Sequence, residues 1–310
     1  MLFFKKKRQH LPQAVALEDE PGEEDQPELE LTHVDRYEII APIGRGGMGT
    51  VYKAIDRERD KTVAIKVLER RFDLDKRRRK RDYLGREVMI AAALEHPAIV
   101  RMHKEIIVQE DLQGHLRRCL LMEYVDGPNL RKHIRDRDLS IRQMIDLCKK
   151  LCMGLDFLHQ NNVIHRDIKP ENFLLTRDMK HVKIVDFGLS KIASGWFSLW
   201  DKEHGGTRSY MSPEQLSKRK LDTRSDIFSF GITMYELFAG RHPCPAEGRE
   251  RLRQLRSSSF RFEPPSKINP ELPLQLDKII LKALRRKPES RYQSMTELLL
   301  DLSRMGESRI

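Results

Sequence analysis

One short stretch, VIHRDIKPENFLL, constrains this 310-residue chain more than any other. In it Asp167 is followed by Lys169 and, five residues after the aspartate, by Asn172. The Asp167 carboxylate can accept the proton of a hydroxyl group and orient that hydroxyl. Asn172 can offer an uncharged oxygen to Mg²⁺, and Lys169 can neutralise a transferring phosphoryl group. A lone aspartate would be read as a surface residue, but this set predicts a phosphoryl-transfer site.

Two further charged residues occupy positions that disfavour charge. Lys66 lies inside the apolar run TVAIKVL, which is costly unless the ammonium is paired or faces a ligand. Its partner on the following helix is predicted to be Glu87 in GREVMI, with Glu95 as the alternative. If Lys66 has no functional role, it is an edge-strand lysine whose ammonium group extends to solvent. Asp186 follows the β-branched run of KIVDFGLS and offers a hard oxygen ligand for Mg²⁺. These residues predict phosphate and metal contacts.

A glycine-rich stretch, IGRGGMGTVY, contains Gly44-x-Gly46-x-x-Gly49-x-Val51. Dinucleotide-binding folds use the same spacing, but there the glycines lie between a strand and a helix. Here β-branched runs stand on both sides. This context favours a hairpin whose backbone closes over phosphates, against the alternative of a turn without a ligand.

The chain divides by composition and periodicity. Residues 1–36 are rich in Glu, Asp and Pro and are predicted to be a disordered acidic leader. Short β-branched runs from Tyr37 predict an antiparallel sheet with one main helix, and helical periodicity dominates after Gly127. We therefore expect a bilobal α+β fold with a cleft between the lobes. The domain is predicted over 37–303, with lobes at about 37–123 and 124–303 and a short tail over 304–310.

The charge is unevenly distributed. The chain carries +11, of which the leader contributes −4 and the remaining residues +15. The densest basic run lies within DKRRRKRD, over 76–81. The simplest interpretation of this run is a solvent-exposed loop. Nucleic-acid binding is disfavoured because aromatic residues are scarce around the run, and the acidic leader is one candidate partner.

No apolar run reaches the ~18 residues of a membrane span. The four cysteines suggest reduced core thiols in a cytoplasmic protein, with zinc ligation as the alternative.

Taken together, these motifs resemble the eukaryotic-type (Hanks-type) serine/threonine protein kinases, from about Tyr37 to about Leu302. HRDIKPEN is similar to the serine/threonine branch, and GRGGMGTVYKA and YMSPEQL are similar to bacterial members. The resemblance implies transfer of the ATP γ-phosphate to Ser or Thr hydroxyls of protein substrates, autophosphorylation, and Mg²⁺ as the metal, with Mn²⁺ as an alternative. It also implies nucleotide contacts at Ile43, Gly44, Gly46, Gly49, Val51, Ala64, Lys66, Met122, Glu123, Val125 and Leu174.

The resemblance further implies catalytic roles for Asp167, Lys169, Lys66 and Glu87, metal binding by Asn172 and Asp186, and a Glu214–Arg291 pair. Asp226 should brace the catalytic loop, and Thr207 should contact that loop. A pseudokinase is the rival reading, but its usual mark is loss of one of these residues. Substrate preference stays open, because Glu171 suggests tolerance of basic substrates whereas the positive domain suggests acidic ones.

The segment between Asp186 and Glu214 is unusual because it contains both tryptophans of the chain. Arg166 precedes Asp167, and such kinases usually pair this arginine with a phosphorylated residue in the segment. Counting back four residues from Thr207 reaches Glu203, which we expect to replace that phosphate; phosphorylation at Ser198 is the alternative. Trp196 and Trp200 are predicted to pack as a short restraining helix or to form an exposed docking patch for a substrate or a second copy.

Overall fold

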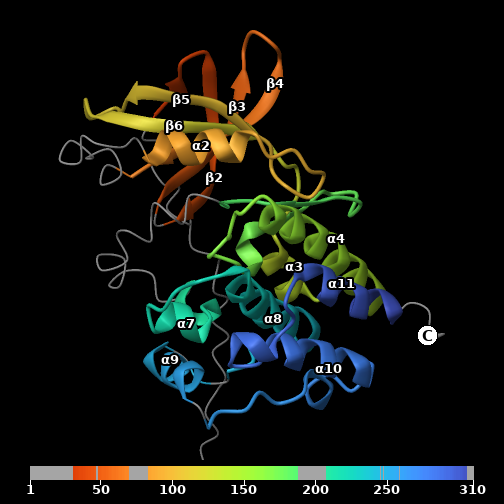
Figure 1. Ribbon diagram of the computed structural model, residues 1–310. Coiled ribbons are helices and arrows are strands. Elements are labelled where there is room, and N and C mark those ends of the chain that lie inside the picture. The colour runs from red at the N-terminus through yellow and green to blue at the C-terminus, as the bar shows by residue number, and fades with distance from the viewer. Residues whose placement is uncertain are drawn as a thin grey trace, which may run out of the picture.

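The N-terminal lobe is a six-stranded antiparallel sheet in the order β1-β2-β3-β4-β6-β5, with helix α2 beside it (Figure 1). In this computed structural model the described residues are 31–46, 48–69, 83–187, 207–244, 246, 248–257 and 259–305. The elements of the lobe are β1 (His33–Val34), β2 (Tyr37–Gly46), β3 (Gly49–Asp56), β4 (Lys61–Leu68), α2 (Tyr83–Ala92), β5 (Met102–Glu110) and β6 (Leu116–Glu123).

The sheet begins earlier than the predicted boundary. Val34 pairs with Tyr37, and the side chains of Leu31 and Val34 are fully buried in a small cluster on one face of the sheet. Residues 31–36 therefore belong to the folded lobe and not to the leader. The sequence prediction missed them because two strand residues are too few to produce a readable alternation.

The C-terminal lobe is mainly helical. Its long helices are α4 (Ile141–Gln160), α8 (Thr223–Ala239), α10 (Leu274–Ala283) and α11 (Met295–Arg304), and its shorter elements are α3 (Leu130–Asp136), η2 (Pro170–Asn172), β7 (Phe173–Leu175), β8 (Val182–Ile184), η3 (Thr207–Tyr210), α7 (Pro213–Leu216), α9 (Gly248–Arg256), η4 (Pro265–Lys267) and η5 (Pro288–Ser290). This arrangement confirms the predicted two-lobed α+β fold (Figure 1).

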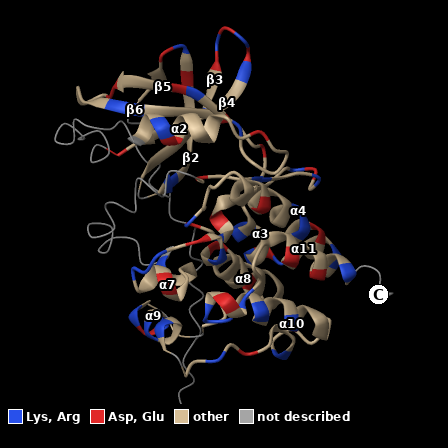
Figure 2. Ribbon diagram, in the orientation of Figure 1, with Lys and Arg blue, Asp and Glu red and all other residues tan. Residues whose placement is uncertain are grey.

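Local signals explain the two central helices. Ser140 caps α4 in a capping box with Gln143, as its position before the apolar periodicity predicts. Helix α8 is buried from Ser225 to Ala239, which confirms the prediction of a buried helix. It ends at Gly240 in the left-handed conformation. Charged residues occur in both lobes, among them the turn between β3 and β4 and the helices α9 and α11 (Figure 2).

One hydrophobic core joins the two lobes. It runs from Leu68 and Val88 of the sheet lobe through Ile99 and Ile184 to the helices of the second lobe. The backbone supports the same junction, because Val100 N donates to Ile184 O at 3.0 Å and Ile184 N donates to Ala98 O at 2.8 Å. Among the described residues, no helix is both long and apolar enough to cross a membrane.

Candidate active site

A cleft of about 1140 Å³ lies between the lobes and collects the predicted nucleotide, catalytic and metal residues. Its walls include strands β2 to β4 and β6 on one side and the loop before β7 with Asp186 on the other. The sequence-predicted residues that line it are Ile43, Gly44, Gly46, Gly49, Val51, Ala64, Lys66, Met122, Glu123, Val125, Asp167, Lys169, Asn172, Leu174 and Asp186. Positions that are widely separated in the sequence therefore meet in one cavity.

The roof of the cleft is the hairpin between β2 and β3. Gly46 pairs with Gly49, so the glycine-rich stretch forms the predicted turn between two strands. Gly49 has a φ of +144°, and a Cβ atom there would lie 1.9 Å from the carbonyl oxygen of Val67. A side chain at this position would collide with the neighbouring strand, so the hairpin requires glycine here.

Neighbouring strands also place the apolar residues that line the cleft. Ala64 of β4 pairs with Met122 of β6, and both side chains are buried. Leu174 of β7 forms a bridge with Asn129 on the opposite side. The cavity thus has apolar residues on two sides and polar residues at one end, the usual composition of a cofactor site.

Lys66 is a buried cation at this polar end. Its side chain is 4% exposed, and its Nζ lies 2.6 Å from Asp186 Oδ1. Burial raises the pKa of the Asp186 carboxyl, but the hydrogen bond and charge of Lys66 outweigh that effect and hold the pKa below its usual value. The carboxylate therefore stays ionised at neutral pH.

The predicted Lys66–Glu87 pair does not occur among the ion pairs of the described residues. Glu87 lies on α2, half-buried, but the carboxylate bound to Lys66 is that of Asp186. The sequence identifies both carboxylates but not which one lies nearer, because that depends on the position of α2 relative to the sheet. Glu87 is also outside the lining of the cleft.

The catalytic loop is held together by its own side chains. Asn172 Nδ2 donates to the Asp167 carbonyl at 2.6 Å and to Asp167 Oδ2 at 3.1 Å. Lys169 Nζ lies 3.0 Å from the same Oδ2. Asp167 is therefore positioned by an amide and a cation, with its carboxylate at the cleft surface.

Asp226, at the start of α8, fixes the backbone that precedes this carboxylate. It is 1% exposed and accepts hydrogen bonds from His165 N, Arg166 N and His159 Nε2, each at 2.8 Å. Arg166 has a φ of +66°, a strained conformation that these bonds and a bond from Gln215 Nε2 to its carbonyl support. Burial raises the pKa of the Asp226 carboxyl, but the hydrogen bonds from His159 and the backbone lower it by more, so the pKa lies below its ordinary value.

Asn172 and Asp186 fit a divalent metal by the chemistry of their donor atoms. Because Asn172 uses its nitrogen to donate to Asp167, its amide oxygen is left as an acceptor. Val185 N donates to Asn172 O at 3.0 Å, so the two metal candidates are tied by the adjacent backbone. Mg²⁺ characteristically takes few protein oxygens and completes its shell with water and phosphate oxygens.

The outer end of the cleft contains a charged cluster of which the sequence indicated one residue. Arg131 Nε lies 2.8 Å from Glu171 Oε1, and its NH1 lies 2.7 Å from Glu236 Oε1. Tyr210 hydrogen-bonds to both Arg131 and Glu236. Glu171 was identified from its motif, whereas the other three come from α3, η3 and α8 and carry no sequence signal that links them.

Behind the cleft, the predicted pair between Glu214 and Arg291 is present. Arg291 NH1 and NH2 lie 2.7 and 2.9 Å from the two carboxylate oxygens, and both side chains are buried. Burial raises the pKa of Glu214, but Arg291 lowers it below its ordinary value. Thr207 opens η3, and the regulatory candidates Trp196, Ser198, Trp200 and Glu203 lie outside the described residues, as does the basic run 76–81.

A two-lobed fold whose cleft joins a glycine hairpin, a buried lysine and this carboxylate set defines the class of phosphoryl-transfer domains that act on ATP. The chain matches the protein kinase domain family over residues 37–301 and belongs to that family. Its curated relatives include a probable serine/threonine-protein kinase of Clostridium acetobutylicum, 34% identical over 280 residues, and serine/threonine-protein kinase PknB of Mycobacterium tuberculosis, 36% identical over 276 residues. It is therefore a Hanks-type member that resembles bacterial serine/threonine kinases.

These alignments cover 89% and 87% of this chain but 41% and 43% of the relatives, so the chain spans less than half the length of either. Among solved structures, a crystal structure of the PknI kinase domain of Mycobacterium tuberculosis matches with a TM-score of 0.65 and 26% identity, over 89% of this chain and 98% of that one. A second crystal structure of the same domain matches with a TM-score of 0.67 and 25% identity, over 90% of this chain and 99% of that one.

Proposed function

We propose that this chain is a serine/threonine protein kinase that transfers the γ-phosphoryl group of ATP to Ser and Thr hydroxyls of protein substrates. The observation that carries the proposal is the convergence of Lys66, Asp167, Lys169, Asn172 and Asp186 in one interlobe cleft. All five residues that such transfer needs are retained. This retention argues against a pseudokinase.

We assign one role to each side chain. Asp167 accepts the proton of the acceptor hydroxyl, and its orientation is set by Asn172. Lys169 stands next to Asp167 and neutralises charge on the phosphoryl group. Lys66 binds the phosphates from the sheet side. Mg²⁺, held by Asp186 and Asn172, would supply neutralisation of the phosphate charge, with Mn²⁺ as an alternative ion.

The direct test is transfer from [γ-³²P]ATP to a protein substrate, followed by phosphoamino-acid analysis. We expect phosphoserine and phosphothreonine with the unchanged chain. Lys66→Ala and Asp186→Asn should each reduce transfer by roughly 10²-fold or more while the circular dichroism spectrum is retained. Transfer by Asp186→Asn near the wild-type rate would contradict the assignment.

The cluster around Arg131 supports a substrate preference that the sequence left open. Glu171 and Glu236 line the outer cleft, but each is already paired with Arg131. Arg251 lines the same cleft, and Arg249 and Arg256 add positive charge on α9, whereas Lys132 is paired with Asp136 and Arg253 with Glu250. We therefore propose that substrates are neutral or acidic around the acceptor residue, because Arg131 already occupies both carboxylates and the cations of α9 repel a basic peptide.

Regulation is proposed to depend on the segment between Asp186 and Glu214. Glu203 orders it in place of a phosphorylated residue, so that basal activity needs no activating phosphorylation. Full activity of Glu203→Ala would contradict the replacement of a phosphorylated residue by Glu203. The same conclusion would follow if phosphatase treatment abolished activity and Ser198→Ala reproduced that loss. Trp196 and Trp200 are proposed to pack as a short restraining helix, and an exposed docking patch for a substrate or a second copy is the alternative.

Two further parts of the proposal concern the chain outside the active site. Contact between the acidic leader and the basic run 76–81 is proposed from their opposite charges. Neutralising the leader carboxylates should then change the salt dependence of activity. Autophosphorylation is proposed from the family resemblance, and mass spectrometry of the chain after incubation with ATP tests it. A cytoplasmic location is proposed from the four cysteines, which are predicted to be reduced core thiols.

A further inference from the structure

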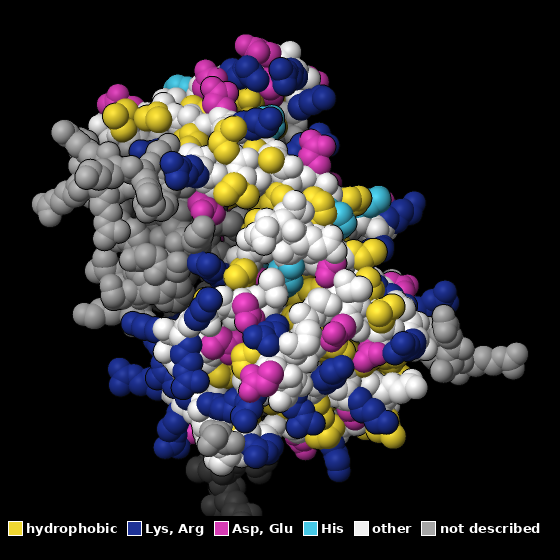
Figure 3. Space-filling model, viewed as in Figure 1, with side chains coloured by type: hydrophobic (Ala, Val, Ile, Leu, Met, Phe, Trp, Pro, Cys, Tyr) yellow, Lys and Arg dark blue, Asp and Glu magenta, His cyan; other side chains and the backbone are white. Residues whose placement is uncertain are grey.

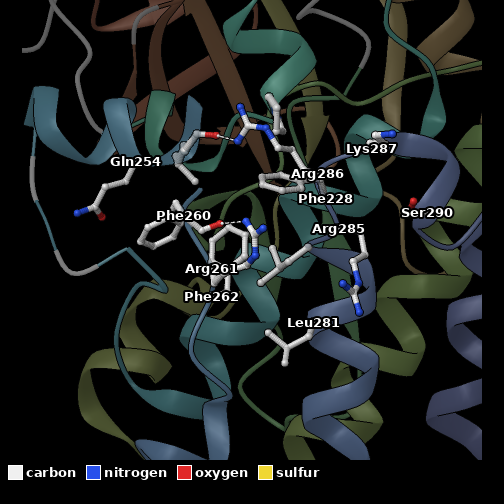
Figure 4. A pocket seen from close by; sticks show the side chains of 13 residues that line it. Phe228, Gln254, Phe260, Arg261, Phe262, Leu281, Arg285, Arg286, Lys287 and Ser290 are labelled. Carbon is white, nitrogen blue, oxygen red and sulfur yellow. Dashed lines mark hydrogen bonds between the residues drawn. The ribbon is translucent and has the colours of Figure 1, made fainter. Parts of the chain in front are cut away.

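A second cavity, of about 510 Å³, lies in the C-terminal lobe between α7, α8, α9 and α10 (Figure 4). None of its lining residues belongs to the interlobe cleft. Its size falls within the range of pockets that bind small ligands or anchoring side chains. The phosphoryl-transfer mechanism gives it no role.

The interior of this cavity is apolar and aromatic. Phe228 on α8 is buried at its base, and the rings of Phe262 and Phe228 meet edge to face at 6.2 Å. Phe260 meets Phe262 in the same way at 5.2 Å, and Leu281 and Leu284 of α10 and its C-terminal end complete the wall. Phe260, Phe262 and Leu281 are only partly buried, so apolar surface remains accessible at the mouth.

The rim of the cavity is basic. Arg261, Arg285, Arg286 and Lys287 line it, and the lining contains no Asp or Glu among the described residues. Figure 4 shows these cations on different sides of the aromatic group. Arg286 is engaged structurally, because its guanidinium donates to the carbonyls of Leu255 and Ser257. The side chains of Arg285 and Lys287 are exposed.

Positive charge continues outward from the rim. Burial lowers the pKa of Arg286, and the charges of Arg219 and Arg261 lower it further, which places these cations in one electrostatic group. In Figure 3, Lys and Arg side chains gather over the part of the helical lobe where α7 and α9 lie. An anion that approaches this face is attracted before it reaches the cavity.

We propose that this cavity is a docking site for a protein segment that inserts an apolar anchor and carries carboxylates on both sides of it. The apolar interior accepts the anchor, and the separated cations of the rim pair with several carboxylates. A single anionic lipid headgroup would satisfy only part of a rim whose cations come from the loop after α9 and from the turn after α10. The peptide therefore fits the charge distribution better than a lipid does.

We expect a segment bound in this cavity to affect the rest of the kinase fold through Arg291. The guanidinium of Arg291 lies 4.9 Å from the ring centre of Phe228 and is paired with Glu214, next to the cavity residue Pro213. Helix α9 contributes Gln254 and Leu255 to this cavity and Arg251 to the interlobe cleft. A docked segment would thus lie on elements that also border the active site.

The test uses the full chain and fluorescence anisotropy of labelled synthetic peptides. The probe EDELFEDE should bind, whereas EDEGGEDE, without the anchor, and KRKLFKRK, with reversed charge, should bind at least about tenfold more weakly. The double variant Arg285→Glu, Lys287→Glu should weaken the probe about tenfold or more. Leu281→Trp, which fills the cavity from its wall, should weaken it without changing charge.

The matched control is Lys267→Glu, Lys278→Glu. It makes the same change in charge at two exposed lysines, one of them on α10, and neither lines the cavity. The control should leave the affinity within about twofold. The proposal would be overturned if the control lost as much affinity as the double variant, or if the probe did not bind to the wild type. It would also be overturned if anionic lipid vesicles bound with the same sensitivity to the variants while the peptide did not bind. Because binding is read without ATP, a failed phosphotransfer assay does not affect this result.

Discussion

The substitution Asp226→Asn tests whether one buried carboxylate organises the catalytic loop. Its Oδ2 accepts from His165 N and His159 Nε2, and its Oδ1 accepts from Arg166 N. Asparagine has nearly the same shape but only one acceptor oxygen. Whichever way the amide is placed, at least one of these donors loses its acceptor and faces an NH₂ group.

The cost follows from the number and type of bonds lost. A hydrogen bond to a charged group is worth roughly 1.5–3 kcal/mol, and an unsatisfied buried donor costs about 1–3 kcal/mol. We therefore expect the free energy of unfolding to fall by about 3 kcal/mol. Catalysis should fall as well, because the backbone of Arg166, with its φ of +66°, loses its support directly before Asp167.

Urea unfolding followed by circular dichroism in the far ultraviolet measures the first effect, since the helical lobe dominates that signal. The matched control is Asp222→Asn, an exposed N-cap of the same helix at which asparagine caps equally well. The control should differ from the wild type by about 1 kcal/mol or less, because it loses only the exposed ion pair between Asp222 and Arg224. If Asp226→Asn were as stable as the control, the proposed bracing role would be refuted.

Three other substitutions probe the surrounding structure. Glu214→Gln removes a carboxylate whose pKa is depressed by Arg291, so the wild type should lose this stabilisation as the pH falls below the ordinary value of 4.5, and the variant should show a flatter urea-stability profile against pH. At neutral pH the variant should be less stable by about 3 kcal/mol. Arg131→Ala should free Glu171 and raise kcat/KM for a basic peptide relative to an acidic one, whereas an unchanged ratio would contradict the substrate proposal. Gly49→Ala should raise the KM for ATP severalfold, because the new methyl group displaces the hairpin.

The predictable part of this protein is the part encoded in short contiguous motifs. The catalytic loop is a single stretch whose internal bonds join Asp167, Lys169 and Asn172, so spacing alone indicates the site. Helix periodicity and the Ser140 cap likewise predict α4, because both are local properties. The family resemblance then identifies the fold that brings the motifs together.

The parts that sequence reasoning missed depend on contacts between distant segments. Arg131 joins Glu171 and Glu236, which come from different elements and lie far apart in the sequence. The Lys66–Asp186 pair, in place of Lys66–Glu87, depends on where α2 lies against the sheet. The second cavity combines four helices and a loop, and no motif marks its aromatic interior.

The most direct test of the central claim is single-turnover transfer from [γ-³²P]ATP by Asp167→Asn, with ATP affinity measured on the same sample. Asp167 contributes a proton acceptor and lines the cleft beside Lys169, whereas the apolar walls and Lys66 lie elsewhere in the cavity. We predict that transfer falls by about 10²–10⁴-fold while the Kd for ATP stays within about threefold. Transfer near the wild-type rate would contradict the assignment of Asp167, and with it the proposed kinase mechanism.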